Sequence, residues 1–140
     1  MATTMLSRPK RGEAVPLEPV VDPAAWSAAD LEADKGWIHS LSATHIAELD
    51  SLVQKIEPTI ESVLDIDPAD IVLPTLGPRL ENVADDIING RGLALIRGVP
   101  IERYTRLQAG IAFWCIGSFV GTPVSQNAKG HLLGHVADLG

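Results

Sequence analysis

The closest approach to a metal-binding pattern in this sequence is a pair of histidines near its C-terminal end. His131 and His135 are four residues apart in GHLLGHVADLG, and Asp138 follows three residues later. Imidazole nitrogens and carboxylate oxygens bind zinc and iron, and on a helix residues four apart lie on one face, about 6 Å apart. A helix here would therefore supply two ligands to a single ion.

Glycines disfavour that helix. Gly130 and Gly134 each cost about 1 kcal/mol relative to alanine in a helix interior. On a strand, with a rise of about 3.3 Å per residue, the two imidazoles would lie about 13 Å apart, too far for one ion, and His135 and Asp138 would be on opposite faces. We expect two ordinary histidines and no metal ligand. The alternative is a small protein that binds Fe(II) or Zn(II) through His131 and His135.

The remaining candidates are single residues. His45 falls at the third position of an expected helix, where Glu or Gln would complete a capping box, so we interpret it as a surface or cap residue. His39 has no partner at ligand spacing. Cys115 lies in the apolar stretch IAFWCIGSF and is expected to be a buried hydrophobic residue. Arg91 and Arg97 are suited to a carboxylate by residue type alone.

The glycines of GRGLAL invite comparison with a dinucleotide-binding loop. Such a loop follows a strand and opens a helix, so that backbone N–H groups face a pyrophosphate. Here Gly90 and Gly92 close a helix and open a strand, and the third glycine is missing. We expect no nucleotide site, and Gly90 is predicted to end the helix in a left-handed cap.

Apolar residues at helical spacing predict three longer helices that carry these residues. Ser42 is a suitable N-cap for a helix over residues 43–57, and RLENVADDIINGRG predicts a second helix that ends at Gly90. The third is expected over about 105–119. Ser27 is predicted to cap a short helical turn near the N-terminus. The inner face of the third helix is expected to carry Leu107, Ile111, Trp114 and either Cys115 or Ser118.

The other segments predict short strands or irregular structure. The apolar run LALIR, residues 93–97, predicts a buried strand covered on both faces, and short strands are expected at about 123–125 and 132–137. Residues 1–22 hold several prolines and predict an extended or disordered arm. Residues 58–78 are expected to form an irregular crossing.

Length and composition indicate one soluble domain. The chain has 140 residues, 46% hydrophobic and 21% charged, which is ordinary for a globular protein with a sizeable core. Its net charge of −7 disfavours nucleic-acid partners, and its longest apolar stretch is too short to span a membrane. A single cysteine allows no internal disulfide, and the first residues lack an export signal, so a cytoplasmic location is expected. Trp26 and Trp37 are expected to pack in a core or interface.

A set of glycines and prolines, with one short strand between them, carries a family resemblance. Its members are Gly90 with Gly92, the strand ending at Arg97 and Gly98, Pro100, and GTPVSQN from Gly121. Upstream of them stand DPAAWSAADL and GWIHSLSATHIAEL. Over residues 22–140 this pattern resembles the N-terminal part of the TauD/TfdA-like dioxygenases, which depend on Fe(II) and 2-oxoglutarate.

The resemblance implies an α+β fold made of the outer helices and first strands of an incomplete double-stranded β-helix, a jelly-roll of the clavaminate synthase-like kind. Residues 23–140 would be the N-terminal part of that domain, after the arm at residues 1–22. It also implies oxidation of a small-molecule substrate with Fe(II), molecular oxygen and 2-oxoglutarate. In that family a His-x-Asp pair and a distant second histidine bind the iron.

The sequence departs from this family at the metal site. It contains no His-x-Asp, and the family's iron ligands and the arginine that holds 2-oxoglutarate would be expected beyond Gly140. We therefore assign no catalytic, cofactor-binding or metal residue, and expect no cofactor on the chain alone. The expected function is a fragment of an oxidoreductase, truncated before the iron-binding motif and inactive by itself. The alternative is a non-catalytic binding or dimerisation module that self-associates through exposed apolar surface.

Overall fold

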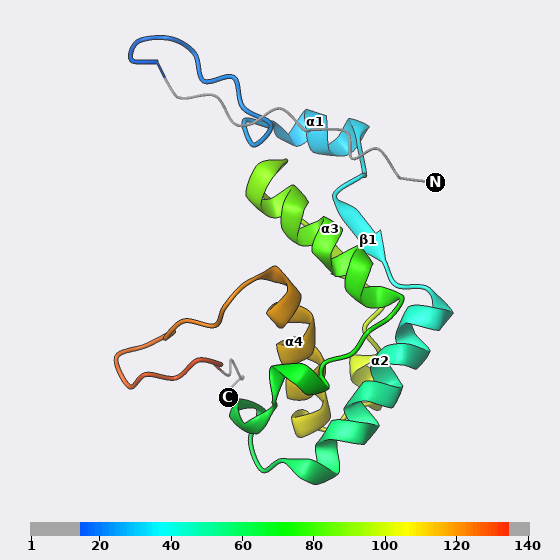
Figure 1. Ribbon diagram of the computed structural model, residues 1–140. Helices are drawn as coiled ribbons and strands as arrows, with labels where there is room; N and C mark the ends of the chain where they lie inside the picture. Colours follow the sequence, from blue (N-terminus) through cyan, green and yellow to red (C-terminus); the bar gives the residue numbers. More distant parts are fainter. Residues whose placement is uncertain (1–14, 135–140) are drawn as a thin grey trace, which may run out of the picture.

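Helices dominate the structure, a computed structural model that describes residues 15–134 (Figure 1). The elements in chain order are α1 (Ala28–Ala33), β1 (Ile38–Ser40), α2 (Ala43–Ile56), α3 (Leu76–Asn89), β2 (Leu95–Arg97) and α4 (Arg106–Val120). Single 3₁₀ turns lie in the connections: η1 (Glu57–Thr59), η2 (Val63–Asp65), η3 (Pro68–Asp70) and η4 (Ile101–Arg103). The described residues thus mix helices with one small sheet, as the predicted fold class requires.

The helices α2, α3 and α4 enclose the hydrophobic core. Leu49 and Val53 of α2, Leu80 of α3 and Ile111 of α4 are each at most 1% exposed. Burial of side chains of this size contributes about 1.5–3 kcal/mol each. Among the described residues no polar or charged residue is buried as a whole. Apolar packing between these three helices therefore holds the fold together.

The strands β1 and β2 form a parallel pair. His39 lies opposite Ile96 at the centre of the pair. Two backbone hydrogen bonds flank this central residue pair, each 2.8 Å long. The Leu95 N–H donates to the Trp37 carbonyl oxygen, and the Leu41 N–H donates to the Arg97 carbonyl oxygen. Parallel strands need a long crossover connection, and here that connection contains α2 and α3. The pair thereby ties the N-terminal segment to the chain that follows α3.

Local caps explain why the sequence predicted two helices to within one residue. The Ser42 Oγ accepts the His45 backbone N–H at 3.2 Å, and the His45 Nδ1 accepts the Ser42 N–H at 3.2 Å. Thr105 and Gln108 make the same reciprocal pair at the start of α4. The predicted cap at Ser27 is also present and begins α1.

The start of α3 differs from the prediction. It begins at Leu76, several residues earlier than expected, and includes part of the segment predicted to be irregular. The cause is a contact from α2: the Glu48 carboxylate accepts hydrogen bonds from the backbone N–H of Thr75 (3.0 Å), the Thr75 hydroxyl (2.8 Å) and the Leu76 N–H (2.7 Å). An acidic group at a helix N-terminus accepts hydrogen bonds from the free N–H donors and is attracted by the positive end of the helix dipole.

The predicted left-handed cap at Gly90 is wrong. Gly90 has φ −112°, and the left-handed residue is Gly92, with φ 81°. Glycine is required at position 90 for a different reason, namely space. A Cβ there would lie 2.3 Å from the Asp86 Oδ1 and 2.8 Å from the Asp86 carbonyl oxygen.

Two predictions about strands are also wrong. The run at 93–97 forms a strand only over Leu95–Arg97, and its residues are half-buried or exposed, because Ile96 packs against the core but the sheet has no further described strand beside it. Residues 123–125 and 132–134 form no strand, since none of the described strands pairs with them. Residues 135–137 of the second predicted strand lie outside the described part.

Helix α4 is apolar on nearly every face. Ile111, Ala112 and Cys115 are fully buried, whereas Phe113 on the outer side is 65% exposed. Of the predicted inner face, Leu107 and Trp114 are half-buried and Ser118 is exposed. None of the helices in the described part of the chain combines the length and apolarity that a membrane crossing demands.

Candidate functional site

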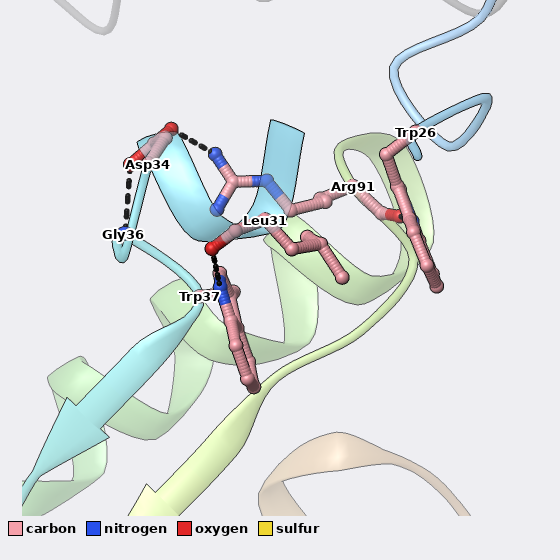
Figure 2. A network of polar contacts seen from close by, with 6 residues as sticks. All are labelled: Trp26, Leu31, Asp34, Gly36, Trp37 and Arg91. Carbon is pink, nitrogen blue, oxygen red and sulfur yellow. Dashed lines mark hydrogen bonds and ion pairs between the residues drawn. The ribbon is translucent and has the colours of Figure 1, made fainter. Parts of the chain in front are cut away.

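A polar joint connects the N-terminal segment to the turn after α3 (Figure 2). The carbonyl oxygen of Arg91 accepts a hydrogen bond from the Trp26 Nε1 at 3.0 Å, and the Arg91 Nη2 donates to the Asp34 Oδ2. Arg91, which follows α3, thus binds one residue before α1 and one residue after it in the sequence. We call the following set the N-terminal joint: Trp26, Leu31, Asp34, Gly36, Trp37, His39 and Arg91.

Further hydrogen bonds shape the turn that leads from α1 into β1. The Trp37 Nε1 donates to the Leu31 carbonyl at 3.1 Å, and the Gly36 N–H donates to the Asp34 Oδ1 at 2.7 Å (Figure 2). A Cβ at Gly36 would lie 3.0 Å from that Asp34 oxygen, so the turn is too tight for a larger residue without adjustment. These bonds direct β1 toward β2.

The carboxylate of Asp34 is held in its charged form. The hydrogen bond from Gly36, followed by the charge of Arg91, keeps the pKa of Asp34 below its ordinary value. Arg91 therefore does bind a carboxylate, and that carboxylate belongs to this chain. The Asp34 side chain is 63% exposed, so solvent screens the ion pair and its main effect is on orientation. Arg97 is exposed at the end of β2.

An open hollow of about 480 Å³ lies beside the joint. An indole, two carboxylates and a guanidinium face it, and its lining residues are Pro23, Ala25, Trp26, Asp30, Leu31, Ala33, Asp34 and Arg91. Asp30 and Asp34 are already engaged, by Ser27 and Arg91 respectively. These groups hold the segment in place, and they contain no nucleophile paired with a base, the arrangement that covalent catalysis needs.

Two buried polar atoms in the joint have no hydrogen-bond partner. They are the His39 Nε2 and the Arg91 Nη1, and no other buried side-chain nitrogen or oxygen among the described residues shares this condition. A buried polar atom without a partner costs roughly 1–3 kcal/mol. The joint therefore contains the polar groups whose hydrogen bonding is least satisfied in the described structure.

Of the two histidines weighed as metal ligands, only His131 lies among the described residues. His131 is exposed in the segment after α4, where its backbone N–H donates to the Asn127 Oδ1 at 3.3 Å and its ring Nδ1 lies 3.0 Å from the Asn127 Nδ2. His135 and Asp138 lie outside the described residues. Within residues 15–134, no three His, Cys, Asp or Glu side chains come together as a metal site would require.

The expectations for His45 and Cys115 are confirmed. His45 completes the capping box at the start of α2, with an imidazole nitrogen in place of a carboxylate oxygen. Cys115 is fully buried, and burial raises the pKa of its thiol to about 11. A thiol with so high a pKa is a poor nucleophile at neutral pH.

A second polar cluster, around Asp50 of α2, was not anticipated from the sequence. Asp50 accepts hydrogen bonds from the Tyr104 hydroxyl at 2.6 Å and from the Arg103 Nη2 at 2.9 Å. Burial, followed by this contact with Asp50, raises the pKa of Tyr104. The partners are far apart in sequence, so no local pattern indicates the cluster. It anchors the turn before α4 to α2.

The described residues therefore define a scaffold of three packed helices with two polar clusters, the N-terminal joint and the contacts of Asp50. No family model matches the chain. Among curated proteins, the chain is 28% identical over 123 residues to FR-33289 synthase from Streptomyces rubellomurinus. It is also 28% identical over 118 residues to the taurine hydroxylase-like protein SAT17 from Stachybotrys chartarum.

These two matches confirm the predicted resemblance to TauD/TfdA-like dioxygenases. They cover 88% and 84% of this chain. They cover 36% and 31% of the relatives, so the chain spans about a third of the length of the curated relatives it matches.

Proposed function

We propose that residues 23–140 form the N-terminal part of a TauD/TfdA-like dioxygenase domain. In this proposal α2, α3 and α4 are outer helices, and β1 and β2 belong to the first strands of its jelly-roll. The whole enzyme oxidises a small molecule with Fe(II) and 2-oxoglutarate. The observation that carries the proposal is the similarity to two relatives over more than four-fifths of this chain.

The described residues of this chain do not fit an iron site. The sequence has no His-x-Asp, and the described residues gather no three potential metal ligands. The role proposed for the chain is therefore structural: it packs around the catalytic part, whose iron ligands come from outside these 140 residues, and it has no oxygenase activity by itself. A cytoplasmic location is part of this proposal, because the first residues lack an export signal and the single cysteine allows no internal disulfide.

The inactivity of the chain is tested by metal and cosubstrate binding. The purified chain is titrated anaerobically with Fe(II) by calorimetry, with and without 2-oxoglutarate, and succinate formation is then followed in air. We expect neither stoichiometric binding nor succinate above a protein-free blank. One equivalent of bound Fe(II) would contradict the proposal, and its loss in His131→Ala or His135→Ala would then favour the metal-binding alternative.

The structural role is tested with a chimera. The matching segment of FR-33289 synthase is replaced by this chain, and iron binding by the soluble product is measured. We expect the chimera to fold and to bind one iron. The matched control carries Leu80→Asp, which places a charge in the core between the helices and should abolish folding. A chimera no more soluble than this control would count against the proposal.

One observation favours a second function, a non-catalytic dimerisation module. Phe113 is 65% exposed on α4, a helix that is apolar on nearly every face. Helices of that kind are usually covered on all sides. This function predicts a defined dimer by light scattering that Phe113→Ser converts to monomer. A monomeric wild-type chain at high micromolar concentration would exclude it.

A further inference from the structure

The N-terminal joint contains buried polar atoms without hydrogen-bond partners, and few contacts hold the N-terminal segment to the chain after α3. Both buried polar atoms without partners belong to it, His39 Nε2 in β1 and Arg91 Nη1 in the turn after α3. The link itself consists of a three-residue strand pair, one indole hydrogen bond and one exposed ion pair. Ile96 of β2 packs against the apolar core, but none of the buried core residues belongs to α1, β1 or β2, so the joint can separate while the core stays packed.

The surroundings of His39 favour the neutral imidazole. Burial lowers the pKa of His39, and the charges of Arg79 and Arg91 lower it further, while Asp86 acts in the opposite direction. Arg79 and Asp86 lie on α3, and Arg91 follows it; the facing residue of β2 is the uncharged Ile96. Protonation would place an N–H donor on an atom that has no acceptor, close to two guanidinium groups.

We propose that the N-terminal joint is acid-sensitive, and that protonation of His39 releases the segment carrying α1 and β1 from α3 and β2. In the open state His39 is hydrated and free to accept a proton. The proposal rests on the joint alone and holds whether or not the chain is part of an oxygenase.

The direction of the pH effect follows from the two states. Above the ordinary histidine pKa of 6.5, the imidazole is neutral in both states and the closed joint is at its most stable. As the pH falls below that value the open state takes up the proton first, so the closed joint loses stability. Asp34 stays ionised in this range because its own pKa is lowered, so loss of its ion pair cannot cause the opening.

Hydrogen exchange at two amides reports the opening. The N–H of Leu95 donates to Trp37 and that of Leu41 to Arg97, and both bonds exist only in the closed joint. We expect their protection factors, corrected for intrinsic exchange, to fall several-fold between pH 7 and pH 5, because the open state takes up the proton more readily than the closed joint. Amides within α2 and α4 should keep their protection, because the core remains closed.

Two variants separate His39 from other sources of pH dependence. His39→Leu removes the titrating group and should reduce the loss of protection to less than twofold. His131→Asn removes an exposed histidine in the segment after α4 and should behave as the wild type. Unchanged protection in the wild type, or an equal loss in His39→Leu, would overturn the proposal.

A measurement on the wild type keeps the proposal testable if His39→Leu does not fold. The ring signals of His39 and the indole N–H of Trp37 are followed by NMR from pH 8 to pH 4.5. We expect His39 to titrate below the ordinary histidine value of 6.5, and the Trp37 indole signal to shift with the same midpoint. A His39 midpoint at or above 6.5, or an indole signal that does not respond, would refute the proposal.

Discussion

A single carboxylate on α2 sets the point at which α3 begins. Burial disfavours the charged form of Glu48, but hydrogen bonds from Leu76 N–H, Thr75 N–H and the Thr75 hydroxyl outweigh burial. With a smaller contribution from the His45 charge, they lower the pKa of Glu48 below its ordinary value. Thr75 occupies the N-cap position but makes no cap of its own. Glu48 does from another helix what an N-cap residue usually does locally.

Replacing Glu48 with glutamine is expected to lower the free energy of unfolding by about 1 kcal/mol at pH 7. Because the folded-state pKa is lowered, this contribution is present above the ordinary value of 4.5 and disappears as the pH falls through the folded value. Urea unfolding at pH 7 and pH 3.5 measures both effects. Glu81→Gln, on the exposed side of α3, should change stability by less than about 0.5 kcal/mol.

Because Cys115 is buried, we expect its thiol to be unreactive. With a pKa of about 11, the thiolate is scarce at pH 8, and the α2, α3 and α4 packing shields the sulfur. We expect Ellman's reagent to react with the native chain at least about a hundredfold more slowly than with a free cysteine. The reaction should reach one equivalent in 6 M urea. Rapid reaction of the folded chain would mean that α4 is not packed as described.

At the scale of the element, two glycines in α4 have different surroundings. A Cβ at Gly117 would meet nothing within 4 Å, whereas one at Gly110 would lie 3.3 Å from the Val63 Cγ1 of η2. Each glycine lowers helix propensity to the same degree. Gly110 is therefore required for the close approach of η2, and Gly117 is not required by any described neighbour.

Alanine at these two positions separates propensity from packing. Gly117→Ala is expected to raise the free energy of unfolding by about 0.8 kcal/mol. Gly110→Ala gains the same propensity but pushes against Val63, so its net effect should be smaller or negative. Urea titrations of both variants against the wild type provide the comparison. Equal stabilisation would show that η2 moves freely away from α4.

Sequence reasoning succeeded for elements whose signals are local. Ser42 predicted the start of α2 because a cap acts within four residues, and the apolar spacing of residues 105–119 predicted α4. It failed where the partner is distant in sequence: the Glu48 contact that begins α3, and the pairing of β1 with β2. A three-residue strand such as β1 carries no periodicity of its own, and its existence depends on β2.

The same division holds for the candidate site. The residue type of Arg91 is suited to a carboxylate partner, but only the fold identifies Asp34 as that partner. The sequence could not predict that the His39 Nε2 is buried without a hydrogen-bond partner, because this results from the packing of β1 near α3. Absence of the family's His-x-Asp was visible from the sequence alone.

At the scale of the whole molecule, stability depends on the interface between three helices. Leu80 of α3 is 1% exposed in that interface, whereas Ile88 on the same helix is 58% exposed. Leu80→Ala is expected to cost about 2–5 kcal/mol and Ile88→Ala less than about 0.5 kcal/mol. Urea unfolding followed by circular dichroism and by tryptophan fluorescence measures both. Similar losses in the two variants would mean that Ile88 is covered in solution.

The parallel pairing of β1 with β2 also constrains the order in which the chain folds. The two strands are separated in sequence by α2, η1, η2, η3 and α3, so their pairing closes a long loop. This closure costs conformational entropy, and it gains a pairing of only three residues per strand. Helices held by local caps and by their shared core form without that closure. The strand pair is therefore the last contact that a refolding chain makes, and the N-terminal segment stays accessible to proteases and chaperones until it closes.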